Sequence, residues 1–184
     1  MESCKMDYEK SGIVVFCILA LSFQVAPATG GVTSHRVPSI ERLTKRADVI
    51  IIGKVLLTQS EWNTTRTAIS TRIDLQVQEV FKGSVSGEQL SFYQLGGKVG
   101  EIASSISGVP SFERGETVLL FLSRRKDGTL GVVGLFHGRF LLEKEAASGG
   151  LMAIRREPDS GKILDRIPLE QARDQILKAL ELSK

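Results

Sequence analysis

Histidine and cysteine, the side chains most often used in catalysis and metal binding, are rare and widely spaced in this chain. Two histidines, His35 and His137, and two cysteines, Cys4 and Cys17, make up the whole set. A zinc site needs several such ligands at set spacings. The chain also lacks a G-x-S-x-G nucleophile elbow and a G-x-x-x-x-G-K-[ST] phosphate loop. We therefore expect no catalytic set, no metal site and no bound cofactor.

Three polar residues, His137 among them, have side chains that can do acid–base chemistry. His137 lies between Gly134 and Gly138, and with a serine and an aspartate it could serve a hydrolase. A histidine at a bend of a sheet is the simpler interpretation, because no partner motif accompanies it. Asp74 and Glu79 could form a carboxylate pair. At this spacing on a strand they point to opposite faces, so we expect each to be solvated.

The polar segment 58–66 carries the only tryptophan of the chain, Trp62, and we expect it to form the tip of a hairpin. Tryptophan is enriched at binding hot spots, so Trp62 is a candidate binding residue. It could alternatively fold back over the mouth of the barrel. Asn63 opens an Asn-Thr-Thr sequon, which predicts a glycosylated, solvent-facing tip only if the source is eukaryotic.

Two basic clusters complete the set of candidate binding residues. Arg124, Arg125 and Lys126 precede an Asp-Gly pair that predicts a hairpin turn, and Arg155–Arg156 fall near another predicted turn. Most such clusters are solvated surface or charges that protect an exposed edge strand. We take the first cluster as a candidate binding element and expect both to lie at the surface.

The beginning of the chain predicts export. Residues 13–23 form an apolar run that is shorter than the roughly 20 residues a membrane span needs, and a small-x-small site ends at Ala28. We expect a signal peptide over residues 1–28, cleaved after Ala28, and one secreted or periplasmic domain over residues 29–184 with no membrane span. Both cysteines would then be removed. The charge before the apolar run is balanced, which leaves an uncleaved N-terminal anchor as the alternative.

Short apolar segments between turn residues predict a mainly β fold. Val49–Ile52 are four β-branched residues in a row, typical of a buried strand, and Gly53 after them predicts a bulge or a barrel bend. Residues 69–77 alternate apolar and polar side chains. Ser39 caps a predicted short helix, and an apolar stripe predicts an amphipathic helix at about 167–183. We expect a small OB-like, partly open β-barrel with a short N-terminal helix and a C-terminal amphipathic helix.

Two segments of the chain carry a family resemblance. Residues 47–55 (ADVIIIGKV) and 75–83 (LQVQEVFKG) resemble the opening of netrin-like, tissue-inhibitor-of-metalloproteinase-like domains, which fold as OB-like barrels. Later segments look like a group of uncharacterised bacterial exported proteins. The metalloproteinase inhibitors of the netrin-like family chelate the zinc of a protease through an N-terminal cysteine. This chain has no cysteine after Ala28, so the resemblance implies the fold and not that mechanism.

These observations favour a non-enzymatic binding module outside the cytoplasm that engages a protein or a glycan through Trp62 and the cluster at 124–126. A protease-associated inhibitor or chaperone without the cysteine mechanism is the first alternative, and a hydrolase that uses His137 is the second. The net charge of +3 at pH 7 is too small to favour nucleic acid, and export disfavours it further.

Overall fold

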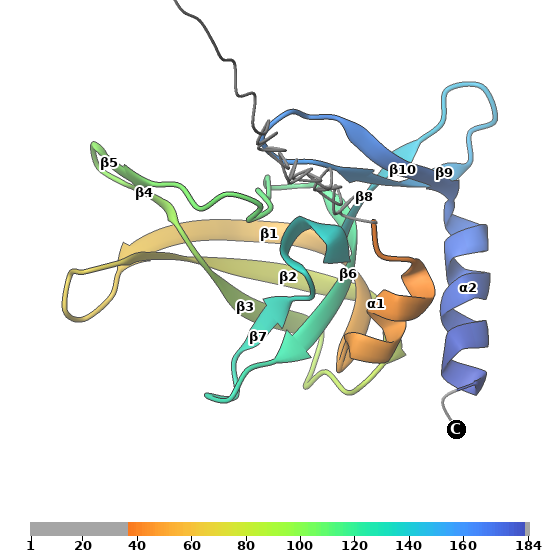
Figure 1. Ribbon diagram of the computed structural model, residues 1–184, viewed down its shortest axis with the longest axis horizontal. Helices are drawn as coiled ribbons and strands as arrows, with labels where there is room; N and C mark the ends of the chain where they lie inside the picture. The colour runs from red at the N-terminus through yellow and green to blue at the C-terminus, as the bar shows by residue number, and fades with distance from the viewer. Residues whose placement is uncertain (1–36, 183–184) are drawn as a thin grey trace, which may run out of the picture. The chain divides into compact units, whose positions relative to one another are not determined.

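A computed structural model describes residues 37–182 of the chain (Figure 1). The predicted signal peptide, its cleavage site and His35 lie outside the described residues. The fold is mainly β with two helices, as the sequence predicts. No helix between residues 37 and 182 has the length and hydropathy that crossing a membrane requires.

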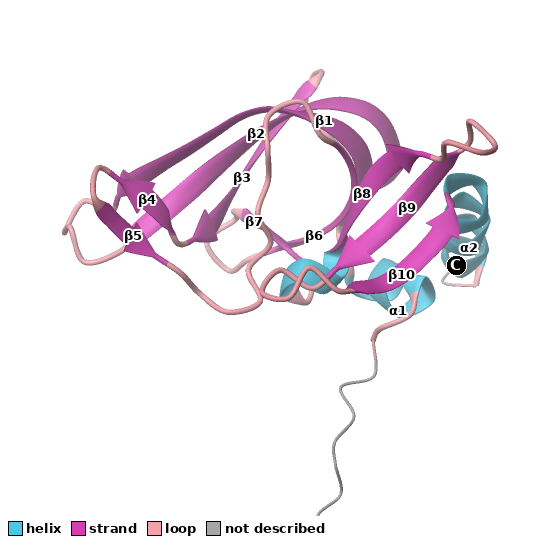
Figure 2. Cartoon of the chain, turned by 90° about the horizontal axis from the view of Figure 1, so that it is seen from above, coloured by secondary structure: helices cyan, strands magenta, loops and turns pink. Residues whose placement is uncertain are grey.

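A strongly curled antiparallel sheet forms the body of the domain, and its strands follow the order β10-β9-β8-β6-β1-β2-β3, with β7 paired to β6 off this path. The curl is visible in Figure 2. The sheet is not closed into a barrel, because β3 and β7 each pair on one side only. The strands of this sheet are β1 (Val49–Trp62), β2 (Ile69–Lys82), β3 (Gln89–Leu95), β6 (Thr117–Arg124), β7 (Leu130–Val132), β8 (Arg139–Lys144), β9 (Leu151–Arg156) and β10 (Ile163–Pro168).

Four smaller elements complete the fold: β4 (Gly97–Val99) and β5 (Ile102–Ser104) pair with each other, η1 (Leu135–Gly138) is a turn of 3-10 helix, and α1 (Ile40–Arg46) precedes β1. Ser39 caps α1 as predicted, because its Oγ accepts the backbone N–H of Arg42 at 3.3 Å. The C-terminal helix α2 spans Leu169–Glu181. The predicted helix is therefore present, and it starts slightly later than residue 167 because Ile167 and Pro168 still pair with β9.

Two apolar cores explain the unbroken apolar runs at 49–52 in β1 and 118–122 in β6. Alternate residues of both strands face the helices on one side and the inside of the curl on the other, so both faces of the sheet are covered there. The helix-side core contains Ile50, Ile52, Leu119, Phe121, Phe140, Leu43 and Ile176. The inner core contains Val49, Ile51, Val55, Leu75, Phe92, Val118 and Leu120.

The register of the long β1–β2 hairpin has a bulge beside Gly53, where the pairing shifts between Ile52 and Gly53, and the extra residue, Gln78, lies on β2 opposite the glycine. The predicted hairpin tip at 58–66 is too long, because β1 continues to Trp62 and pairs there with Ile69. The tip is therefore the segment 63–68. Asn63 Oδ1 accepts the backbone N–H groups of Thr67 and Ala68, at 2.8 and 3.2 Å, and closes it.

Candidate functional site

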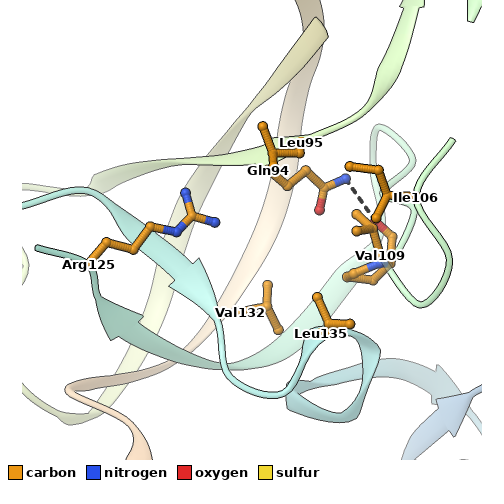
Figure 3. A pocket seen from close by; sticks show the side chains of 8 residues that line it. Gln94, Leu95, Ile106, Val109, Arg125, Val132 and Leu135 are labelled. Carbon is orange, nitrogen blue, oxygen red and sulfur yellow. Dashed lines mark hydrogen bonds between the residues drawn. The ribbon is translucent and has the colours of Figure 1, made fainter. Parts of the chain in front are cut away.

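An apolar cleft opens where the sheet fails to close. It lies between the end of β3, strand β7, η1 and the loop that follows β5 (Figure 3), and its volume is about 130 Å³. On this side of the sheet, β3 and β7 have no further strand partner in the described part of the chain. The lining residues are Gln94, Leu95, Ile106, Val109, Pro110, Arg125, Val132 and Leu135. We call this space the cleft.

Large apolar side chains on the walls of the cleft are exposed to solvent. Leu95 is 56% exposed, Leu135 is 49% exposed and Ile106 is 41% exposed. Scattered exposed leucines are ordinary, but apolar side chains gathered on one concave surface mark an interaction site. The lining of the cleft is therefore suited to bind an apolar group.

Two backbone features hold Leu135 in place at the wall of the cleft. Leu135 has φ +59, in the left-handed region that a leucine rarely adopts. The amide of Phe136 donates to the carbonyl of Gly108 at 3.0 Å and ties η1 to the loop opposite. Strained residues of this kind persist where the surrounding structure fixes them and are concentrated at functional sites.

Gln94 supplies an unused hydrogen-bond acceptor at the cleft. Its Nε2 donates to the carbonyl of Pro110 at 2.8 Å, which fixes the orientation of the amide. Its Oε1 is buried and has no hydrogen-bond partner in the described part of the chain. A buried oxygen without a donor is costly. Because Oε1 is screened from solvent, a ligand N–H group would reach it only after the side chains around it move, and would then gain a hydrogen bond.

Arg125 supplies a positive charge at the opposite side of the cleft from Ile106 and Val109 (Figure 3). Its guanidinium lies over Gly131, where an added Cβ would be 2.7 Å from Nη2 and 2.9 Å from Cζ. Among residues 37–182, no carboxylate forms an ion pair with Arg125. Arg125 is exposed, and its charge also helps to lower the pKa of the nearby Asp127 carboxyl group without forming an ion pair with it. The guanidinium is therefore accessible to an anionic group at the edge of the cleft.

Of the candidate binding residues that the sequence suggests, only Arg125 lines the cleft. The backbone N–H of Arg124 donates to Asp48 beside the start of β1, whereas Trp62 ends that strand. At about 3.3 Å per residue, roughly 40 Å of strand separates them. Lys126 is exposed in the turn after β6. The cluster at 124–126 thus lies beside the start of β1 while Trp62 lies at its end, so the two do not form one site.

The expectation that Arg155 is a surface charge is wrong. Arg155 is only 1% exposed, its Nη2 donates to Asp165 Oδ2 at 2.8 Å and its Nη1 donates to the carbonyl of Pro38 at 2.9 Å. Burial lowers the pKa of Arg155, and the hydrogen bond with Asp165 acts against that shift. Arg156 is the outer member of the pair, 3.4 Å from Glu143. The buried arginine is part of the scaffold.

The other residues considered for chemistry serve structural contacts. The ring of His137 packs against that of Phe136, tilted by 40° and with centroids 4.1 Å apart. Asp74 accepts hydrogen bonds from Arg72 and Ser91, and Glu79 Oε2 accepts one from Arg173 at 2.6 Å. The two carboxylates therefore have different partners and do not form a pair. Each is in an ion pair, so the expectation that they are only solvated is wrong. Within residues 37–182, no three His, Cys, Asp or Glu side chains gather as a metal site would require.

Sequence reasoning missed the cleft because its lining comes from four separate segments of the chain. A signal was present: Ile106, Val109 and Leu135 are large apolar residues in glycine-rich stretches that form no regular strand. No protein-family model matches the chain, and no curated protein is significantly similar to it. The resemblance to netrin-like domains therefore stays a prediction.

Proposed function

We propose that this domain is a non-enzymatic binding module that engages a protein partner by receiving an apolar side chain in the cleft. The observation that carries the proposal is the concave wall of Leu95, Ile106 and Leu135, each of them exposed by two fifths or more. With the predicted export signal, the partner would be met in the cell envelope or outside the cell.

The size and lining of the cleft favour a protein over a glycan. An engineered apolar cavity of about 150 Å³ holds one benzene molecule, so a cleft of about 130 Å³ suits one side chain of the size of leucine or phenylalanine. Sugar hydroxyls need several polar partners. The cleft offers two polar side chains, Gln94 and Arg125, and otherwise aliphatic groups.

A displayed library of random peptides, selected against the full chain, tests this function. Selected peptides should share one apolar residue, and Leu135→Asp should abolish their binding because it places a charge in the apolar wall. The matched control is Leu177→Asp, because Leu177 is 50% exposed on α2, away from the cleft, and its variant should bind normally. A selection without any shared apolar residue, or binding that survives Leu135→Asp, would overturn the proposal.

A further inference from the structure

We propose that the cleft recognises an apolar residue that stands beside a carboxylate, with Arg125 holding the carboxylate and Gln94 holding a backbone N–H. This inference rests on the proposed function and names the ligand chemistry of the same site. Three features of the described residues carry it: a cation that forms no ion pair, an acceptor without a donor, and an apolar space between them.

The charge of Arg125 selects the anion. The guanidinium offers planar paired donors that match the geometry of a carboxylate. Arg125 reaches the cleft from the β6–β7 turn, whose geometry is fixed because the backbone N–H of Arg125 donates to the carbonyl of Thr129 at 2.7 Å. The backbone of Arg125 is thus held in place without a ligand.

Gly131 acts as a positioning residue for Arg125. Its missing Cβ leaves the space that the guanidinium occupies, and an added methyl group would come within 2.9 Å of Nε, Cζ and Nη2. Gly131 lies in β7 opposite Ser123, and its backbone does not have positive φ, so alanine fits the strand. Gly131→Ala would therefore displace the guanidinium without changing the net charge.

The acceptor on Gln94 selects the second group. Oε1 is buried at the cleft while Nε2 is held by Pro110, so the side chain cannot satisfy both atoms by turning over. A peptide that lays an apolar side chain in the cleft brings a backbone N–H with it. An apolar residue at a chain terminus, or one followed by aspartate, brings the carboxylate as well.

Four hexapeptides, titrated calorimetrically into the full chain, separate these ligands. The first ends in leucine with a free carboxylate and the second is its amide. The third is amidated and has aspartate after the leucine, and the fourth has asparagine there. A second set replaces leucine by phenylalanine. We expect one of the two carboxylate peptides to bind about tenfold more tightly than its neutral counterpart. If it is the first peptide, the cleft recognises a terminal carboxylate, and if it is the third, the cleft recognises the side chain of aspartate.

Variants of the chain then test the assignment to Arg125. Arg125→Gln should remove the preference for the carboxylate and keep the weak binding of the neutral peptide, and Gly131→Ala should reduce the preference in the same direction. Lys126→Gln removes an equal charge from the next residue, which does not line the cleft, and should leave the preference unchanged. Added salt should weaken only the carboxylate peptide.

The possible failures are distinguishable. Equal affinities for acidic and neutral peptides, or a preference that survives Arg125→Gln, overturn the recognition of a carboxylate while binding that depends on Leu135 still supports the proposed function. If none of the peptides binds the unaltered chain and the library selection also yields no apolar anchor, both proposals are wrong.

Discussion

The guanidinium of Arg155 lies 4.5 Å from the centre of the Phe140 ring, inside the helix-side core. From there it donates to Asp165 on the neighbouring strand β10 and to the carbonyls of Pro38 and His137. One buried cation thus connects the segment before α1, the short helix η1 and the edge strand of the sheet. A charge in this place is stable only while its partners remain.

Asp165→Asn should destabilise the fold because it leaves the Arg155 charge without its counter-ion. We expect a loss of about 2 kcal/mol in the free energy of unfolding, below the cost for a fully buried pair because Asp165 is 31% exposed. Denaturant unfolding of the full chain measures it. The control is Glu143→Gln, which breaks the exposed pair with Arg156 and should cost less than about 0.5 kcal/mol. Equal losses in both variants would contradict this account.

Much of the scaffold follows from local patterns in the sequence. The run at 49–52 predicts a strand that is buried on both faces, Gly53 predicts the bulge, and Ser39 predicts the start of α1, because each effect depends on neighbouring residues alone. The burial of Arg155 does not follow from such patterns. It depends on Asp165, Pro38 and Phe140, which only the tertiary fold brings around it.

The cleft could not be predicted for the same reason. Arg125 was a candidate because basic clusters at turns are common binding elements, yet nothing local distinguishes it from Arg124 or Lys126. What distinguishes Arg125 is its place over Gly131 and beside the cleft, which depends on the pairing of β6 with β7. Trp62 was chosen for its residue type, and the length of β1 separates it from this site.

Gly97, in β4, lies against two hydroxyl groups that leave no room for a side chain. Thr71 Oγ1 donates to the carbonyl of Gly96 at 2.7 Å, so the Ser60 hydroxyl, 2.9 Å away, donates to Thr71. A Cβ at Gly97 would overlap both hydroxyl oxygens, and its φ of +133 disfavours any side chain.

Gly97→Ala should therefore lower the free energy of unfolding by about 3 kcal/mol, through steric overlap and backbone strain together. Gly100→Ala is the control, because Gly100 also has positive φ but no atom within 4 Å of the added Cβ. Its cost should be about 1 kcal/mol, from the backbone alone. Denaturant unfolding compares the two, and equal costs would show that the hydroxyl pair can move aside.

Asp127 stabilises the β6–β7 turn through its ionised carboxylate. Oδ1 accepts the hydroxyl of Thr129 at 2.6 Å and its backbone N–H at 2.9 Å, and these bonds lower the pKa of Asp127. The folded pKa is therefore below the unfolded value of about 3.9. The stabilisation is present above the unfolded pKa and is lost as the pH falls through the folded one.

Thr129→Val should raise the pKa of Asp127 toward its ordinary value, because the hydroxyl bond is the largest cause of the shift. Thr129→Ser keeps a hydroxyl group and should keep the lowered pKa. An NMR titration of the Asp127 carboxyl group follows both variants. A titration midpoint that is the same in the valine variant and the unaltered chain would show that the backbone bond is sufficient.

Leu135 and Arg66 are the two described residues other than glycine that have positive φ, at +59 and +55. Arg66 lies in the tip of the β1–β2 hairpin, whereas Leu135 forms a wall of the cleft. Replacing either by glycine should relieve backbone strain of about 1 kcal/mol. Leu135→Gly also loses the contact of its half-exposed side chain, so its free energy of unfolding should change little.

Binding separates the two variants. Leu135→Gly should weaken the selected peptides by about tenfold, because an apolar wall of the cleft is removed, whereas Arg66→Gly should bind them normally and unfold at a higher denaturant concentration. Calorimetric titration and denaturant unfolding on the same samples give both quantities. If Leu135→Gly bound peptides normally, or lost as much stability as a core truncation of about 3 kcal/mol, the strained leucine would serve the fold and not the cleft.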